Sequence, residues 1–253
     1  DVPATTLNKM CGSGMKAAMI AHDQLALGHT DLMVAGGMES MSEAPYLLPQ
    51  MRGGARIGHG RTIDHMFLDG LEDAYEEGRA MGTFAQDTAN EYQLTREQQD
   101  EYSIESLRRA NAAIEAGGFA GEVVPVTFST RKGDVTVDTD EQPGRGRPDK
   151  IPQLRAAFAK DGTITAATSS SISDGAAAVV LTRESVAKEN GQSPVAKVVA
   201  MAAHAREPKD FTVAPVGAIE KVLANAGWTT DDVELWEVNE AFACVAMFAM
   251  RDI

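Results

Sequence analysis

The sequence is poor in cysteine, in basic side chains and in long apolar segments, and each shortage excludes a class of protein. Its 2 cysteines cannot build a disulfide-stapled scaffold and favour a reducing compartment. The 23 Lys and Arg residues face 37 Asp and Glu residues, a net charge of −14. This balance argues against nucleic acid as a partner, because phosphate backbones require basic surfaces. No apolar run approaches the roughly 18 residues of a membrane span.

The first part of the chain follows an α/β pattern. A β-favouring stretch at Val2–Leu7, helical spacing over Gly12–Leu27 and an apolar run at Leu32–Ala35 predict a parallel βαβ unit. The second strand is expected to be buried on both faces. The chain opens without Met and stops just past an apolar helical run, so we expect the central part of a longer protein.

The middle of the chain, from about residue 43, interrupts this pattern and is interpreted as an insertion. Between Asp69 and Glu101 lie ten acids and two bases, which predict solvated helical faces. The pair Thr95 and Gln98 marks the start of an amphipathic helix that ends near Ala116. The other expected elements are strands at Val123–Phe128, Asp134–Val137, Thr163–Ala167, Val195–Ala203 and Leu235–Val238, a loop at Gln142–Pro152, and helices at Ser185–Asn190, Pro215–Ala226 and Glu240–Met250.

Cys11 stands where the first helix is expected to begin, within Asn8–Gly14. The dipole and free N–H groups of a helix N-terminus lower a thiol pKa and stabilise an oxyanion. Gly12 and Gly14 remove side chains near the sulfur, so that a bulky thioester can approach. A buried structural cysteine is the ordinary alternative, but the glycines and the strand-to-helix position favour a nucleophile.

Asn239 follows the predicted strand Leu235–Val238 and stands just before a predicted helix. An Asn at such a place is usually an N-cap. At the C-terminal end of a parallel strand its amide can also hold a water or a carbonyl oxygen. Spacing alone leaves both interpretations open. Cys244, on the apolar run that follows, is interpreted as a core cysteine.

Four ordered segments of the sequence resemble motifs of the thiolase family, which comprises acetyl-CoA acetyltransferases and 3-ketoacyl-CoA thiolases. They are Asn8–Ala17, Val34–Ser42, Ser173–Ala178 and Asn239–Ala243. Their order and spacing also match along the whole chain, which makes the resemblance stronger than any one motif would.

This resemblance implies an α/β fold of the thiolase type, with αβαβα layers, an inserted loop domain and truncation at both ends of this chain. The expected domains are part of the N-terminal α/β half at 1–42, the loop domain at 43–173 and part of the C-terminal half at 174–253. In the family, the loop domain binds coenzyme A and carries a tetramerisation loop, which would lie near Pro45–His65.

The resemblance also implies roles for single residues. Cys11 would be the acylated nucleophile, with its backbone N–H in one oxyanion hole, and Asn239 would hold the water of the other. Ser170 would hydrogen-bond the pantetheine amide. The groove for coenzyme A and pantetheine would be lined by Leu71, Met81, Ala157, Phe158, Ala166, Ser170, Phe211, Ala241 and Phe242. Arg52, Arg56 and Arg61 are interpreted as a surface or assembly loop, with contact to the ligand phosphates as the less favoured alternative. Arg145 or Arg147 would take the place of the family's phosphate-directed arginine, which has no gapless counterpart here.

The sequence departs from the family pattern in three places. The Gly-His-Pro segment, whose His activates the nucleophile, and the Gly-rich segment with a proton-shuttling Cys would both follow Ile253. Before Met81, where acetoacetyl-CoA-type members commonly carry His, this sequence has Ala80. The main alternative to an active thiolase is therefore a non-catalytic coenzyme A-binding fragment. A decarboxylating condensing enzyme is less favoured, because the Asn-Glu-Ala-Phe motif is not typical of that class.

The leading prediction is a thiolase that cleaves or forms 3-ketoacyl-CoA through an acyl-enzyme on Cys11, in fatty acid metabolism. Coenzyme A and acyl-CoA are expected as substrates, with no permanently bound cofactor and no metal. A homotetramer or homodimer is expected, without nucleic acid or membrane partners. The expected compartment is the cytoplasm, with an organellar matrix as the alternative.

Overall fold

The computed structural model describes residues 2–253, which divide into two compact units. Unit 1 contains the chain up to Met81, Ser171–Trp236 and Ile253, whereas unit 2 contains Gly82–Ser170 and Glu237–Asp252. Each unit is therefore assembled from stretches that are far apart in the sequence.

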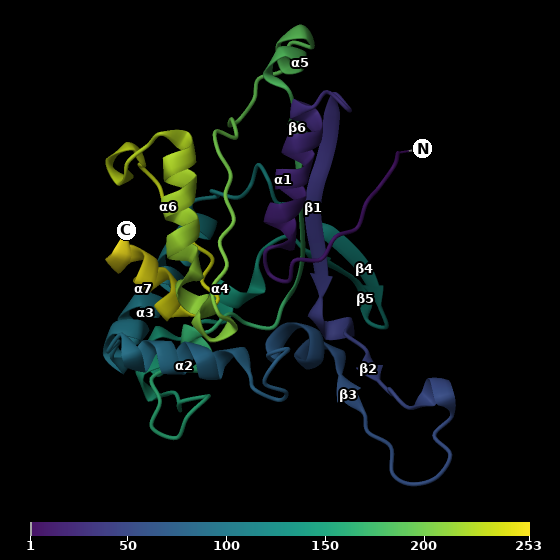
Figure 1. The fold of residues 1–253 in the computed structure, drawn as a ribbon, viewed down its shortest axis with the longest axis vertical. Coiled ribbons are helices and arrows are strands. Elements are labelled where there is room, and N and C mark those ends of the chain that lie inside the picture. Colours follow the sequence, from purple (N-terminus) through teal and green to yellow (C-terminus); the bar gives the residue numbers. More distant parts are fainter. Residues whose placement is uncertain (1) are drawn as a thin grey trace. The chain divides into compact units, whose positions relative to one another are not determined.

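Unit 1 is built on one long antiparallel strand pair. Its helices and strands are α1 (Ser13–Ala26), β1 (Leu32–Ser40), β2 (Tyr46–Leu47), β3 (Ile63–Asp64), β6 (Asp174–Thr182), α5 (Glu184–Glu189) and α6 (Ala214–Ala226). Strand β1 pairs with β6 over its whole length, with Leu32 opposite Thr182 and Ser40 opposite Asp174. Helix α1 packs along this pair (Figure 1). A Cβ at Gly36 would lie only 2.2 Å from the carbonyl oxygen of Ala177, so the close pairing requires glycine there.

Helix α1 confirms the prediction for the first helix. Its buried positions, Ala21 and Leu25, are four residues apart and share one face of the helix. The helix ends at Ala26, and Gly28, which follows the C-cap Leu27, has a φ of 73°, in the left-handed region that glycine adopts without strain. The predicted helices over 185–190 and 215–226 are also present, as α5 and α6.

Unit 2 is largely helical. Its elements are α2 (Met81–Glu91, whose first residue belongs to unit 1), α3 (Arg96–Glu115), β4 (Val126–Thr130), β5 (Gly133–Val137), α4 (Glu141–Arg145) and α7 (Ala243–Asp252). Helix α3 contacts α4 and α7. The side chains of Phe84, Ile164 and Phe248 are fully buried, and the ring of Tyr92 packs on Phe248 with 4.8 Å between centroids. The β4–β5 hairpin confirms the two predicted strands.

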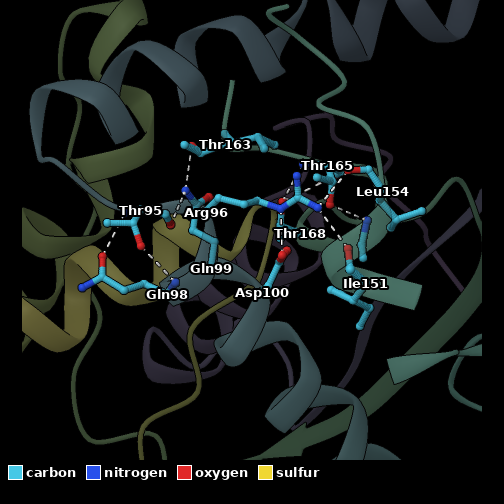
Figure 2. A network of polar contacts seen from close by, with 12 residues as sticks. Thr95, Arg96, Gln98, Gln99, Asp100, Ile151, Leu154, Thr163, Thr165 and Thr168 are labelled. Atoms are coloured by element: carbon cyan, nitrogen blue, oxygen red, sulfur yellow. Dashed lines mark hydrogen bonds and ion pairs between the residues drawn. The ribbon is translucent and has the colours of Figure 1, made fainter. Parts of the chain in front are cut away.

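The start of α3 carries a polar network that ties the helix to the chain around residues 151–168. The Thr95 hydroxyl accepts from the backbone N–H of Gln98, whose side chain accepts from the backbone N–H of Thr95, as the sequence predicts. The Arg96 guanidinium donates to Asp100 at 2.8 Å and to the carbonyl oxygens of Ile151 and Leu154 (Figure 2). One guanidinium therefore ties the start of α3 to the chain at Ile151 and Leu154.

We expect Arg96→Met to lower the free energy of unfolding by about 3 kcal/mol, because it leaves the Asp100 carboxylate without its charged partner. The Asp100 side chain is only 6% exposed, so water does not replace the lost contact. Denaturant unfolding measures the effect. Arg108→Met, on an exposed pair of the same helix, is the matched control and should leave the unfolding midpoint unchanged. Equal effects of the two variants would contradict this prediction.

The predicted parallel βαβ unit is wrong. Val2–Leu7 forms no regular strand, and β1 pairs with β6 in an antiparallel manner. A strand requires a neighbouring backbone to satisfy its N–H and C=O groups, and none lies beside Val2–Leu7 among residues 2–253. Nor is β1 buried on both faces, since Val34 is 65% exposed whereas Ala35 is buried.

Three other predicted strands are also absent. The segments 195–203 and 235–238 are irregular, and 163–167 leads into a single helical turn at Ala166–Thr168. The predicted loop 142–152 contains α4 and a helical turn at Pro148–Gln153. Among the acids of 69–77, Asp69 lies in the π-helical segment Phe67–Leu71 and the others lie outside any helix, and helix α7 begins at Ala243 instead of Glu240. No helix among residues 2–253 has the length and hydropathy to cross a bilayer.

Candidate functional site

Cys11 lies on a tight turn immediately ahead of α1, and its side chain is exposed. The residue before it, Met10, has a φ of 52°, in the left-handed region that side chains with a Cβ rarely adopt. Such backbone strain persists only where the surroundings enforce it, and it gathers at functional sites.

Two polar side chains hold this turn. The Asn8 carboxamide oxygen accepts from the backbone N–H of Met10 at 2.9 Å. The Ser13 hydroxyl accepts from the backbone N–H of Lys9 at 2.8 Å and donates to the carbonyl oxygen of Met10 at 2.7 Å. The turn is thus closed from both sides, and it presents Cys11 to solvent.

The glycines beside Cys11 have no packing role among the described residues. A Cβ at Gly14 would meet no heavy atom within 4 Å, and one at Gly12 would come no closer than 3.5 Å to the carbonyl oxygen of Lys9. Close packing therefore does not explain either glycine. Open space beside the sulfur is what the approach of a bulky thioester requires.

The second and third motifs meet at Asp174. Its carboxylate accepts from the backbone N–H of Ser42 at 2.9 Å and from the Ser42 hydroxyl. These hydrogen bonds, from the hydroxyl first and then from the backbone, hold the pKa of Asp174 below its ordinary value of 3.8. The charged carboxylate therefore links the end of β1 to the start of β6, in the same unit as Cys11.

Asn239 belongs to unit 2 and lies in a turn, four residues before α7 begins at Ala243. It is therefore not the N-cap of that helix, which removes the ordinary interpretation of an Asn at this position. Its side chain is exposed, and its backbone carbonyl oxygen accepts from the N–H of Ala241 at 3.0 Å. The carboxamide forms no hydrogen bond within residues 2–253, so it is available to a ligand.

Ser170 braces this turn. Its backbone N–H donates to the carbonyl oxygen of Ala241 at 3.0 Å, and its hydroxyl donates to that of Glu240 at 2.7 Å. The neighbouring Ser169 forms an antiparallel bridge with Phe242. The Ser170 hydroxyl has used its one proton but keeps a lone pair, so it can still accept from an amide N–H.

The Phe158 ring lies within this cluster. It meets the ring of Phe242 edge to face, with 6.1 Å between centroids. A Cβ at Gly82 would lie 2.2 Å from the tip of the Phe158 ring, so α2 can approach this ring only through glycine. Unit 2 therefore brings together four of the predicted lining residues, namely Phe158, Ser170, Ala241 and Phe242.

The other predicted lining residues are placed separately. Ala157 donates its backbone N–H to the carbonyl oxygen of Ile164 at 2.9 Å, and Ala166 is exposed on the helical turn Ala166–Thr168. In unit 1, Leu71 ends a π-helical turn, Met81 ends the first stretch of the unit, and Phe211 lies in the helical segment Pro208–Val213. Those three side chains are half-buried.

Two of the five arginines proposed for phosphate contact already have acidic partners. Arg61 pairs with Glu77 at 3.0 Å and Arg145 with Glu141 at 3.2 Å, and all four side chains are exposed. Exposed pairs of this kind are weak and can exchange for a phosphate. Arg147 donates to the adjacent carbonyl oxygen of Gly146.

Cys244 differs from Cys11 in its burial. It is fully buried in α7, and burial raises the pKa of its thiol to about 12. A thiol in that environment stays protonated and unreactive at neutral pH. The interpretation of Cys244 as a core cysteine is confirmed.

The sequence reasoning missed the residues that support the site. Asn8 and Ser13 close the Cys11 turn, Asp174 joins two motifs, Gly82 admits Phe158, and Tyr102 contacts Glu240. The tendency of Asn to form turns with its own backbone could have indicated Asn8. The Ser13 contacts are also local, whereas those of Asp174, Gly82 and Tyr102 join distant segments, for which the sequence carries no local signal.

Comparison with known proteins gives consistent matches along the chain. The family model described as thiolase, N-terminal domain, matches residues 1–185, and that described as thiolase, C-terminal domain, matches residues 192–253. An acetyl-CoA acetyltransferase of Allochromatium vinosum is 44% identical over 100% of this chain and 64% of its own length. A mitochondrial acetyl-CoA acetyltransferase of Bos taurus is 47% identical over 98% of this chain and 58% of its own length.

Solved structures agree with the sequence matches. An acetyl-CoA acetyltransferase from Syntrophomonas wolfei superposes with a TM-score of 0.89 at 39% identity, covering 96% of this chain and 61% of its own. The Acat5 thiolase from Ascaris suum, solved in complex with coenzyme A, also superposes with a TM-score of 0.89. It is 41% identical, and the match covers 97% of this chain and 63% of its own. The predicted α/β fold class is confirmed. The chain spans about three fifths of the length of these relatives.

Proposed function

This chain belongs to the thiolase family, and from that premise we propose that its protein is an acyltransferase that cleaves and forms 3-ketoacyl-CoA, with coenzyme A and acyl-CoA as substrates. The observation that carries the proposal is the exposed Cys11 on its strained, hydrogen-bonded turn ahead of α1. The names of the relatives at 44% and 47% identity support the same activity. They do not favour a non-catalytic coenzyme A-binding fragment.

In the proposed reaction, the Cys11 sulfur attacks the 3-keto carbon, and the bond between C2 and C3 breaks. The electron pair of that bond goes to C2, which takes a proton and leaves as acetyl-CoA, while the remaining acyl group stays on Cys11 as a thioester. The thiol of coenzyme A then attacks this thioester and releases acyl-CoA. The covalent intermediate divides one difficult cleavage into two easier steps.

The chain's own residues would serve this reaction in two ways. The backbone N–H of Cys11 and a water held by the Asn239 carboxamide stabilise negative charge on the reacting oxygens. Ser170 receives a pantetheine N–H on its remaining lone pair, while Phe158 and Phe242 border the pantetheine arm. Arg52, Arg56, Arg61, Arg145 and Arg147 are the proposed phosphate contacts. The proton transfers belong to family segments that the resemblance places beyond Ile253.

The organisation of the whole protein follows as part of the same proposal. The segment 43–173 serves as the coenzyme A-binding loop domain, between parts of two α/β halves at 1–42 and 174–253. Assembly as a homotetramer or homodimer and a role in fatty acid metabolism are proposed on the same family ground. The compartment is the cytoplasm or an organellar matrix, and the Bos taurus relative is named as mitochondrial.

The proposal is tested by acylation of the intact protein. Incubation with acetoacetyl-CoA should add one acetyl group to Cys11 and none to Cys244, because only Cys11 is exposed. Peptide mass spectrometry locates the acyl group, and release of acetyl-CoA after addition of coenzyme A shows turnover. Acylation at another residue, or binding of coenzyme A without acylation, would contradict the proposal.

A further inference from the structure

We propose that Tyr102 and Ser106 of helix α3 are positioning residues that fix the Asn239 turn by holding the Glu240 carboxylate. This inference rests on the proposed function, since Asn239 matters only if the protein carries out acyl transfer. The supporting contacts all lie within unit 2.

The first step of the argument is the pair of hydrogen bonds at Glu240. The Tyr102 hydroxyl donates to one carboxylate oxygen at 2.6 Å, and the Ser106 hydroxyl donates to the other at 2.9 Å. Tyr102 and Ser106 are four residues apart and so lie on one face of α3. Glu240 forms no ion pair within residues 2–253, so these two hydroxyls are the groups that hold its charge.

The second step concerns the state of the donor. Partial burial, together with the hydrogen bond to Glu240, raises the pKa of Tyr102 above its ordinary value of 10.0. The hydroxyl therefore keeps its proton across the pH range in which enzymes work. A hydrogen bond from a neutral donor to a carboxylate is shorter and stronger than one between neutral groups, which agrees with the 2.6 Å separation.

The third step is that the backbone around Glu240 is fixed independently of its side chain. Ser170 donates to the carbonyl oxygens of Glu240 and Ala241, and Ala241 donates to that of Asn239. With the carboxylate held by α3, the turn is attached at both its backbone and its side chain. Among the described residues, 2–253, the Asn239 carboxamide has no hydrogen-bond partner, as expected of a group prepared to bind a water or a carbonyl oxygen.

The hydroxyls are tested by Tyr102→Phe, Ser106→Ala and the double variant. Hydrogen–deuterium exchange of the backbone amides of residues 239–243, in the full chain, should be about tenfold faster in the double variant, because two charge-assisted hydrogen bonds are lost. In steady-state kinetics with acetoacetyl-CoA and coenzyme A, kcat should fall about tenfold with KM changed by less than about twofold, as expected when a group acts in the transition state.

Two variants serve as controls. Ser106→Thr keeps the hydroxyl, so its amide exchange at residues 239–243 and its kcat should match those of the unchanged protein. Tyr75→Phe removes an exposed hydroxyl from unit 1 and should change neither.

Unchanged exchange at 239–243 in the double variant overturns the proposal, and so does faster exchange spread over the whole of unit 2, which would indicate general destabilisation. Normal kcat despite faster local exchange overturns the positioning role. Absence of turnover and of Cys11 acylation in the unchanged protein would instead refute the proposed function, while the exchange result would still decide whether the hydroxyls hold the turn.

Discussion

Replacing Cys11 by serine is expected to lower kcat for thiolysis of acetoacetyl-CoA by at least about 10³-fold, because the alcohol is far less acidic and less nucleophilic than the thiol. The side chain is exposed on a turn closed by Asn8 and Ser13, so the smaller oxygen fits without rearrangement. Binding of coenzyme A should be retained. Steady-state kinetics and isothermal titration measure the two effects.

Cys244→Ala is the matched control for this variant. It removes the other thiol, which is buried and has its pKa raised to about 12. We expect it to lower thermal stability, through a small cavity in the core, and to leave kcat largely unchanged. A Cys11→Ser protein that turns over at the normal rate, or a Cys244→Ala protein that is folded but inactive, would show that the nucleophile has been assigned to the wrong residue.

The sequence predicts well those elements whose limits are set by residues within or next to them. Helix α3 begins at Arg96 because Thr95 and Gln98 cap it reciprocally, and α1 ends where Gly28 supplies the left-handed residue. Both signals lie within a few residues of the element they delimit. The β4–β5 hairpin follows from two β-favouring runs separated by a short turn.

The sequence predicts poorly those elements that depend on a pairing partner elsewhere in the chain. Val2–Leu7 and 195–203 have β-favouring composition but no neighbouring strand among residues 2–253, and they remain irregular. Strand β1 was expected to lie in a parallel sheet, yet its partner is β6, more than a hundred residues away. The nature of a strand's partner is not encoded in the strand itself.

The candidate site likewise contains residues that a local sequence signal identifies and contacts that only the fold reveals. Cys11 is recognisable from its motif because its glycines and its place before a helix are local features. The groups that hold the site, such as Asp174 on Ser42 and Tyr102 on Glu240, are separated from their partners by 132 and 138 residues. Asp174, Ser42 and Glu240 stand within the matched motifs, but the sequence does not show which residues they contact. Motif matching therefore finds the proposed nucleophile and does not reveal the contacts that hold the site.

Asn239→Ala is expected to lower kcat about 10²-fold, since it removes one donor to an oxyanion. The unfolding midpoint should not change, because the carboxamide forms no hydrogen bond within residues 2–253 and α7 begins only at Ala243. Asn239→Asp should be more damaging, because its carboxylate repels the negative charge that develops in the transition state. Kinetics and thermal unfolding on the same preparations measure both quantities.

A purely structural role and the proposed catalytic role of Asn239 thus predict opposite outcomes. Removal of a side chain that only stabilised the turn would lower stability and would leave kcat unaffected. Removal of a group that holds a water at the reacting oxygen would lower kcat and leave the unfolding midpoint unchanged. Asn190→Ala, which removes a carboxamide bonded to the Val186 carbonyl at the end of α5, provides the structural comparison and should lower stability slightly with normal kcat. If Asn239→Ala behaves like Asn190→Ala, Asn239 has no part in catalysis.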